Sequence, residues 1–160
     1  MDSRSLFPNL DCVWTLNGWA GVAATAPAPS KYRRIKRKEE MFMVFYDNHG
    51  RPTAYTEDGT HVYLFTGQPV AYFSRDAVYS FNGRLLGWFS NGWIRDLNGN
   101  CVFYSENATG CGPSMPSRSS CPSKSSKASM PSKASMQSRC SRASDKTGWS
   151  QLSGKQFFAQ

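Results

Sequence analysis

The sequence lacks the runs and motifs that identify several large protein classes. No run of about 18 apolar residues occurs in it, so it predicts no transmembrane helix. It also has no G-x-S-x-G, H-E-x-x-H or phosphate-loop pattern, the signatures of serine hydrolases, zinc proteases and nucleotide-binding enzymes. We therefore expect a protein that is not an enzyme and needs no cofactor.

Residue types that bind metals are scarce as well. Only His49 and His61 supply imidazole, and no two cysteines have the C-x-x-C spacing of a zinc site. The cysteine count is odd, and the five are Cys12, Cys101, Cys111, Cys121 and Cys140. Since three of them lie in or beside a Ser-rich stretch, we expect free thiols and a cytoplasmic protein, with disulfides as the alternative.

The formal net charge of +8 is distributed unevenly over the 160 residues. Residues 1–40 carry +3, residues 41–110 carry −2 and residues 111–160 carry +7. Of the 22 Phe, Trp and Tyr residues, 15 fall within 41–110, so this segment has the side chains for a core. Any attraction to nucleic acid or to an anionic membrane would therefore come from the flanks.

Residues 1–40 show no periodic pattern and end in a basic run. We interpret them as a disordered basic lead, or as a mis-assigned start with the true first residue at Met41 or Met43. A weakly apolar stretch at 10–28 has some features of a secretory signal, but polar residues interrupt it. A signal peptide stays the less favoured alternative.

The middle of the chain, residues 43–106, repeats four times with a period of about 16 residues. The repeats align on glycines that are 17, 16 and 16 residues apart: Gly50, Gly67, Gly83 and Gly99. The residue five positions after each of these repeat glycines is aromatic: Tyr55, Tyr72, Trp88 and Tyr104. Agreement at several such offsets in all four copies indicates an internal structural repeat, which we assign to a domain at 41–110.

Each repeat has the composition of a β-hairpin. Asn82-Gly83 and Asn98-Gly99 are typical of two-residue turns with paired positive φ angles, and Asn91-Gly92 marks a turn between repeats. The positions three and five residues after the glycine should share one sheet face, which we expect to be the core. The sequence therefore predicts an all-β fold of four tandem hairpin repeats, an eight-strand meander. Because one hairpin cannot bury its own face, we expect the four to close into a pseudo-four-fold ring or small barrel.

The composition of the chain changes sharply after residue 110. Residues 111–146 are predicted to be a disordered Ser/Pro/Lys-rich tail with a basic residue about every six positions and no aromatic residue. Residues 147–160 form a short terminal peptide that contains Trp149, Phe157 and Phe158. This peptide either docks on its own domain or binds something else.

Several segments together carry a resemblance to a known family. They are FYDNHGRP at 45–52, GRLLGW at 83–88 and GWIRD at 92–96, followed by the Ser/Pro/basic tail and the closing Gly-Trp-Ser stretch. The chain resembles the bacterial four-fold β-flower domain proteins over about 43–110 and its last dozen residues. The resemblance implies a compact ring of four β-hairpin units and implies no established activity.

Five residues are candidates for contact with a partner: Trp93, Arg95, Trp149, Phe157 and Phe158. Arg95 breaks the repeat, because the other three units have tyrosine at its position. Trp93 is either an exposed anchor or part of the core. The Trp and Phe residues of the terminal peptide are candidate tethers.

Three binding functions fit the sequence. We favour a non-catalytic protein-interaction or scaffold module. The alternative is a nucleic-acid-associated protein acting through residues 111–146; since this tail has no aromatic residue for base stacking, such binding would be electrostatic and salt-sensitive. A binder of small ligands or glycans through rim aromatics is the third reading.

Overall fold

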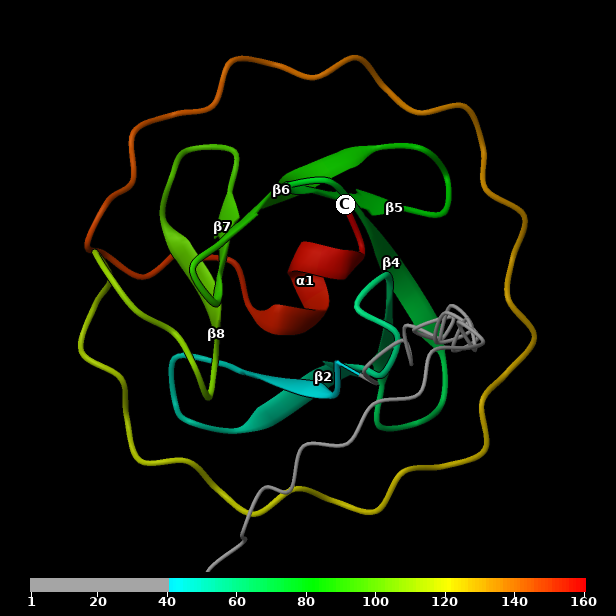
Figure 1. Cartoon of the computed structure of the whole chain (residues 1–160), viewed down its shortest axis with the longest axis horizontal. Helices are drawn as coiled ribbons and strands as arrows, with labels where there is room; N and C mark the ends of the chain where they lie inside the picture. The colour runs from blue at the N-terminus through cyan, green and yellow to red at the C-terminus, as the bar shows by residue number, and fades with distance from the viewer. Residues whose placement is uncertain (1–40) are drawn as a thin grey trace, which may run out of the picture. The chain divides into compact units, whose positions relative to one another are not determined.

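The computed structural model describes residues 41–160, and the predictions for residues 1–40 lie outside this range. Eight antiparallel strands follow one another around a closed barrel (Figure 1). They are β1 (Met43–Tyr46), β2 (Pro52–Thr56), β3 (His61–Leu64), β4 (Pro69–Ser74), β5 (Ala77–Ser80), β6 (Leu85–Ser90), β7 (Trp93–Asp96) and β8 (Cys101–Ser105). A five-residue helix, α1 (Gly154–Phe158), lies near the C-terminus. Nothing helical within 41–160 has the length and apolar character needed to span a membrane.

The barrel closes by pairing its first and last strands. Each strand pairs with its neighbours in sequence, and β1 pairs with β8 so that Phe45 lies opposite Ser105 and Tyr46 opposite Tyr104. Closure satisfies the backbone groups that an open meander would leave exposed at its two edges. The predicted all-β meander of four hairpin repeats, closed into a small barrel, is confirmed.

A β-bulge at the same place in every repeat decides which side chains face the core. In each hairpin the register shifts so that the residue three positions after the repeat glycine has no direct partner. These bulge residues are Thr53, Val70, Leu86 and Val102. A bulge adds one residue to its strand and breaks the alternation of faces. The expectation that positions three and five after the glycine share the core face is therefore wrong.

The barrel interior and the outer face carry separate apolar clusters. The interior cluster includes Phe45, Ala54, Val62, Ala71, Val78, Leu86, Ile94, Val102 and Phe103. The aromatic residues five positions after the glycines, Tyr55, Tyr72, Trp88 and Tyr104, belong to two other clusters. These four side chains are 4% exposed or less, although they do not belong to the interior cluster, so something outside the barrel covers them.

The turns within the repeats differ from those between them. At Asn91-Gly92, between β6 and β7, φ is 51° and 82°, which confirms a two-residue turn. At Asn82-Gly83 only the glycine has a positive φ, of 84°. A backbone hydrogen bond closes that loop over three residues, and the same bond occurs at the fourth repeat glycine. The predicted two-residue turns at these glycines are wrong, because the added bulge residue calls for a longer loop.

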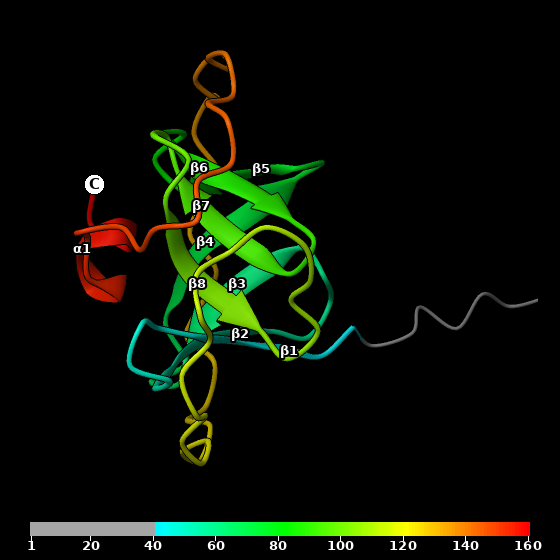
Figure 2. The ribbon, with the colours of Figure 1, turned by 90° about the vertical axis from the view of Figure 1, so that its left-hand side faces the viewer.

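Helix α1 closes one end of the barrel (Figure 2). Phe157 is fully buried in the interior cluster and packs edge to face on Phe103, with ring centroids 5.8 Å apart. Phe158 stacks on the same ring at 5.4 Å. A capping box between Ser153 and Gln156 fixes the start of the helix. The terminal peptide therefore docks on its own domain, one of the two outcomes left open by the sequence.

Residues 111–146, which we call the belt, run around the outside of the barrel (Figure 1). The belt contains no helix or strand, and most of its side chains are exposed. Its composition predicts disorder, whereas the structure places it along the barrel through backbone hydrogen bonds to the repeat loops. The two differ because composition measures only the apolar surface that a segment can bury by itself. The partners of the belt lie on the barrel.

Candidate functional site

The barrel holds the belt at four equivalent points, one in each repeat. At each point a belt carbonyl passes so close to the repeat glycine that a Cβ atom there would overlap with its oxygen. Two residues further on, a belt N–H donates to the carbonyl of the same glycine over 2.8–3.0 Å. The four belt carbonyls belong to Ser117, Ser126, Ser135 and Ser144, at a spacing of nine residues. Each contact requires glycine, because φ is positive and a side chain would displace the belt.

Basic side chains of the belt lie over aromatic rings of the barrel's outer face. The distances from cation to ring centroid are 4.4–5.8 Å for the pairs Arg118–Tyr46, Lys124–Tyr55, Lys127–Tyr63, Lys133–Tyr72 and Arg139–Trp88. Such contacts contribute about 0.5–1 kcal/mol each at exposed sites. Burial raises the pKa of Tyr63, Tyr72 and Tyr104, so these rings stay neutral around pH 7.

Acidic side chains between the aromatic rings add ion pairs to the belt. Glu57 accepts hydrogen bonds from Lys127 and from Lys124 Nζ, the latter at 2.9 Å, and both hold the pKa of Glu57 below its usual range. Arg139 donates to Asp76 over 2.7 Å and lowers the pKa of that carboxyl in the same way. We call this outer surface of the barrel the track. Its side chains are Tyr46, Tyr55, Glu57, Tyr63, Tyr72, Asp76, Tyr79, Trp88 and Tyr104.

Arg95 fastens the two ends of the belt to each other. Its side chain is only 2% exposed. The guanidinium donates to the carbonyl of Cys111 at the start of the belt and, over 2.6 Å, to that of Lys146 at the end. It also donates to the carbonyl of Gly99 over 3.0 Å, and its Nε lies 3.5 Å from a carboxylate oxygen of Asp145. The departure of Arg95 from the tyrosine of the other repeats therefore coincides with the point where the belt closes.

Trp93 and Trp149 lie together beside these contacts of Arg95, which we call the clasp. The Trp93 indole N–H donates to the carbonyl of Thr109 over 3.0 Å, and its ring is 3% exposed. Trp149 packs on Trp93 with ring centroids 6.1 Å apart, and its backbone forms a parallel bridge with Cys101. Of the two interpretations of Trp93, the structure supports burial.

The five candidate interaction residues therefore all have partners within the chain. Trp93, Arg95 and Trp149 gather where the belt begins and ends, whereas Phe157 and Phe158 lie at the capped end of the barrel. Their binding of an outside partner stays a prediction. Sequence reasoning missed the track and the four belt contacts. The signal was present, because serine recurs at exactly those four belt positions, but the six-residue rhythm of basic residues concealed it.

The described residues show no arrangement suited to nucleophilic or metal chemistry. No group of three or more His, Cys, Asp and Glu side chains within 41–160 is placed to hold a metal ion. Burial raises the pKa of the Cys101 thiol to about 11, so the reactive thiolate is not formed near pH 7. The four cysteines in this range form no disulfide. His61, at the start of β3, pairs with Asp58 over 2.6 Å, and the Thr56 hydroxyl donates to the same carboxylate at 3.4 Å and not to the imidazole.

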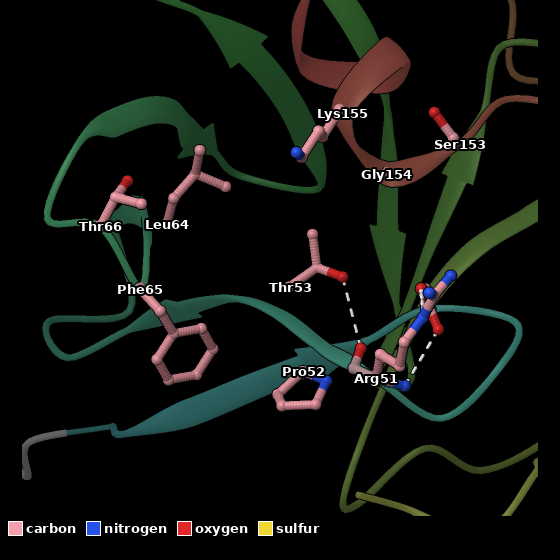
Figure 3. Close-up of a pocket in the computed structure, with 10 residues that line it drawn as sticks. Arg51, Pro52, Thr53, Leu64, Phe65, Thr66, Ser153, Gly154 and Lys155 are labelled. Atoms are coloured by element: carbon pink, nitrogen blue, oxygen red, sulfur yellow. Dashed lines mark hydrogen bonds and ion pairs between the residues drawn. The ribbon is translucent and has the colours of Figure 1, made fainter. Parts of the chain in front are cut away.

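A cavity of about 400 Å³ opens between α1 and the loops of the first two repeats (Figure 3). Pro52, Leu64 and Phe65 supply apolar surface, while Arg51 and Lys155 bring two positive charges. Thr53, Thr66, Ser153, Gly154 and Asp47 complete the lining. Arg51 Nε is bound to Asp47 at 3.2 Å, whereas Lys155 forms no ion pair with any residue of 41–160. Figure 3 shows the ammonium of Lys155 directed into the space between α1 and Leu64.

Comparison with known proteins gives one family. A family model described as "4-fold beta flower protein" matches residues 43–158, which include the barrel, the belt and most of the terminal peptide. No curated protein matches the chain, and no solved structure matches it. The match extends the resemblance seen in the sequence across the belt, so barrel and belt belong to one family unit.

Proposed function

The chain belongs to the 4-fold beta flower protein family, and we propose that it is a non-catalytic protein-interaction module whose binding surface is the track. The partner is an extended polypeptide segment rich in small residues with interspersed Lys and Arg. The belt of the same chain is the intramolecular occupant of this surface. The exposed, unpaired state of Cys111, Cys121 and Cys140 supports a reducing compartment, and we place the protein in the bacterial cytoplasm.

The observation that carries this proposal is the fourfold recurrence of one mode of peptide binding. Each repeat contributes a glycine without a side chain and a carbonyl that accepts an N–H from the bound chain. The first three repeats also contribute aromatic rings that lie under a cation of the belt. Main-chain hydrogen bonds give affinity that is independent of sequence, and the rings and carboxylates select basic residues. The track thus has the components of an extended-peptide site, repeated at regular intervals.

Two polar atoms support the view that the belt is not the best occupant of the track. The hydroxyl of Tyr55 and the indole N–H of Trp88 are buried and have no hydrogen-bond partner within residues 41–160. A buried unpaired donor costs about 1–3 kcal/mol. A segment with a carbonyl or carboxylate at these places would gain that free energy over the belt.

The nucleic-acid alternative gains no specific support from this geometry. Five basic residues of the belt face the rings and carboxylates of the barrel, so their charge is partly neutralised within the chain. Binding to phosphate would have to displace these contacts. We therefore keep the protein partner and leave nucleic acid as an outcome of the experiment.

A synthetic peptide of residues 111–146 with a fluorescent label tests the proposal by anisotropy against the full-length protein. The wild-type chain should bind the peptide weakly, since its own belt occupies the track at an effective concentration in the millimolar range. The variant Lys124→Glu/Lys127→Glu places two more carboxylates beside Glu57 and should loosen its own belt. We expect it to bind the peptide at least ten-fold more tightly than the wild type does.

Two matched controls separate recognition from simple charge attraction. In the first control, a peptide with every Lys and Arg replaced by Gln should bind the loosened variant poorly. In the second, the unchanged basic peptide should bind poorly to a loosened variant that also carries Tyr63→Leu on the track. The proposal is wrong if the loosened variant does not bind the basic peptide. It is also wrong if a single-stranded oligonucleotide displaces the peptide equally well from the loosened variant with and without Tyr63→Leu.

A further inference from the structure

The cavity beside α1 shares no lining residue with the track, and one residue of its apolar wall, Leu64, breaks the fourfold repeat. Three residues before the repeat glycine, the first, third and fourth units have Asp47, Ser80 and Asp96. The second unit has Leu64 at this position. The backbone of all four loops is the same, because the residue at this position donates its N–H to the carbonyl four residues later in every unit.

The polar residues at this position stabilise their own loops. Asp47 accepts the N–H groups two and four residues further on at 2.8 and 2.9 Å, and Asp96 accepts the corresponding pair at 2.9 Å each. Ser80 bonds to Asn82 and to the carbonyl of Arg84. Leu64 gives up these bonds; it packs against the edge of the interior cluster and lines the cavity. A repeat that replaces a loop-stabilising side chain with an apolar one at the wall of a cavity indicates a binding role for that wall.

The charges at the cavity select the sign of the ligand. Lys155 and Arg51 bring two positive charges, and Asp47 balances one of them through its ion pair with Arg51. The remaining positive charge lies beside the apolar surface of Leu64, Phe65 and Pro52. A cavity of about 400 Å³ lies within the range of roughly 300–1,000 Å³ that is usual for small-molecule sites.

We infer that this cavity binds a small carboxylic acid with an apolar chain, the chain lying against Leu64 and Phe65 and the carboxylate beside Lys155. The apolar chain is removed from water, and the carboxylate stays at the open rim, where Lys155 belongs to the lining. The combination of one net positive charge and an apolar wall excludes an alkylammonium ion and gives no advantage to an alcohol.

Titration of the ¹⁵N-labelled full-length protein with octanoate, octanol and octylammonium tests this inference. Octanoate should shift the amide signals of the cavity residues in a saturable manner. Its dissociation constant should be at least ten-fold lower than those of the other two probes. Lys155→Met keeps the aliphatic stem and should reduce octanoate affinity about five-fold or more while octanol affinity stays unchanged. Arg84→Ala, the counterpart of Arg51 in the third repeat, should change nothing.

Leu64→Asp is the decisive variant, because it restores the residue type found in the first and fourth repeats. Its carboxylate can accept the same two loop N–H groups, which offsets part of the apolar contact that Leu64 makes with the interior cluster, so we expect a folded barrel. Its octanoate affinity should drop at least ten-fold. If octanoate fails to saturate, if octylammonium binds as tightly, or if folded Leu64→Asp binds octanoate like the wild type, the inference is wrong.

Discussion

Replacing a repeat glycine by alanine measures what the belt contributes to the stability of the barrel. Gly67 has φ = 84°, and a Cβ there would overlap with the carbonyl oxygen of Ser126 in the belt. Alanine in this left-handed conformation costs about 1–2 kcal/mol. Displacement of the belt adds about 1 kcal/mol for the Ala128 N–H to Gly67 bond and about 0.5–1 kcal/mol for Lys127 over Tyr63. We expect Gly67→Ala to lower the free energy of unfolding by about 3 kcal/mol.

Gly59→Ala provides the matched control. Gly59 also has a positive φ, of 65°, but a Cβ there would only touch Met41 at 3.5 Å. This variant should therefore pay the conformational cost of about 1–2 kcal/mol and nothing for the belt. Urea denaturation monitored by tryptophan fluorescence gives the loss in the free energy of unfolding for each variant. Limited proteolysis should cut the belt faster in Gly67→Ala than in Gly59→Ala. Equal losses of stability with equal belt proteolysis in the two variants would refute the reasoning.

Three further predictions concern the clasp, the ion pairs and the cap. Arg95→Tyr, which restores the residue of the other repeats, should lower the free energy of unfolding by about 2 kcal/mol or more, because buried carbonyls lose a charged donor; a urea titration that shows no loss would contradict the clasp. The pKa values of Glu57 and Asp76 are lowered in the folded protein, so their pairing with the belt is present above their usual pKa near 4 and is lost as the pH falls through the lowered folded values. The protection factors of the belt amides, which correct for the slower intrinsic exchange in acid, should therefore fall before the barrel unfolds; simultaneous loss of protection in belt and barrel would argue against it. Phe157→Ala should cost about 3–5 kcal/mol in the free energy of unfolding, as for other buried aromatic residues, and Phe158→Ala, at a partly buried residue, clearly less; equal losses in chemical denaturation would contradict the capped end of the barrel.

The fold was readable from the sequence because it repeats. Four aligned glycines and strand-length stretches between turns determine a meander of hairpins, and closure follows from the need to bury four equivalent faces. Which side chains face the barrel interior could not be predicted, because a bulge at Thr53 and its counterparts adds one residue and reverses the face of every position beyond it. An alternation argument cannot detect such a residue in a single sequence.

The candidate site was only partly predictable for a related reason. Arg95 was identified because it breaks the repeat, and the structure shows it at the closure of the belt. Leu64 breaks the repeat in the same way but was missed, because a leucine at the end of a strand is typical of an ordinary core residue. The belt was assigned to disorder because its hydrogen-bond acceptors, the carbonyls of Gly50 and the other repeat glycines, lie elsewhere in the chain.

Residue-resolved amide hydrogen exchange across residues 111–146 of the full-length protein tests the central claim most directly. The amides of Ser119, Ala128, Gln137 and Lys146 donate to the repeat glycines, and those of Ser125 and Ala134 to the neighbouring loop carbonyls. These amides should exchange at least ten-fold more slowly than their belt neighbours, with protection recurring every nine residues. Uniform exchange at the rate of an unstructured peptide throughout 111–146 would show that the tail does not occupy the track.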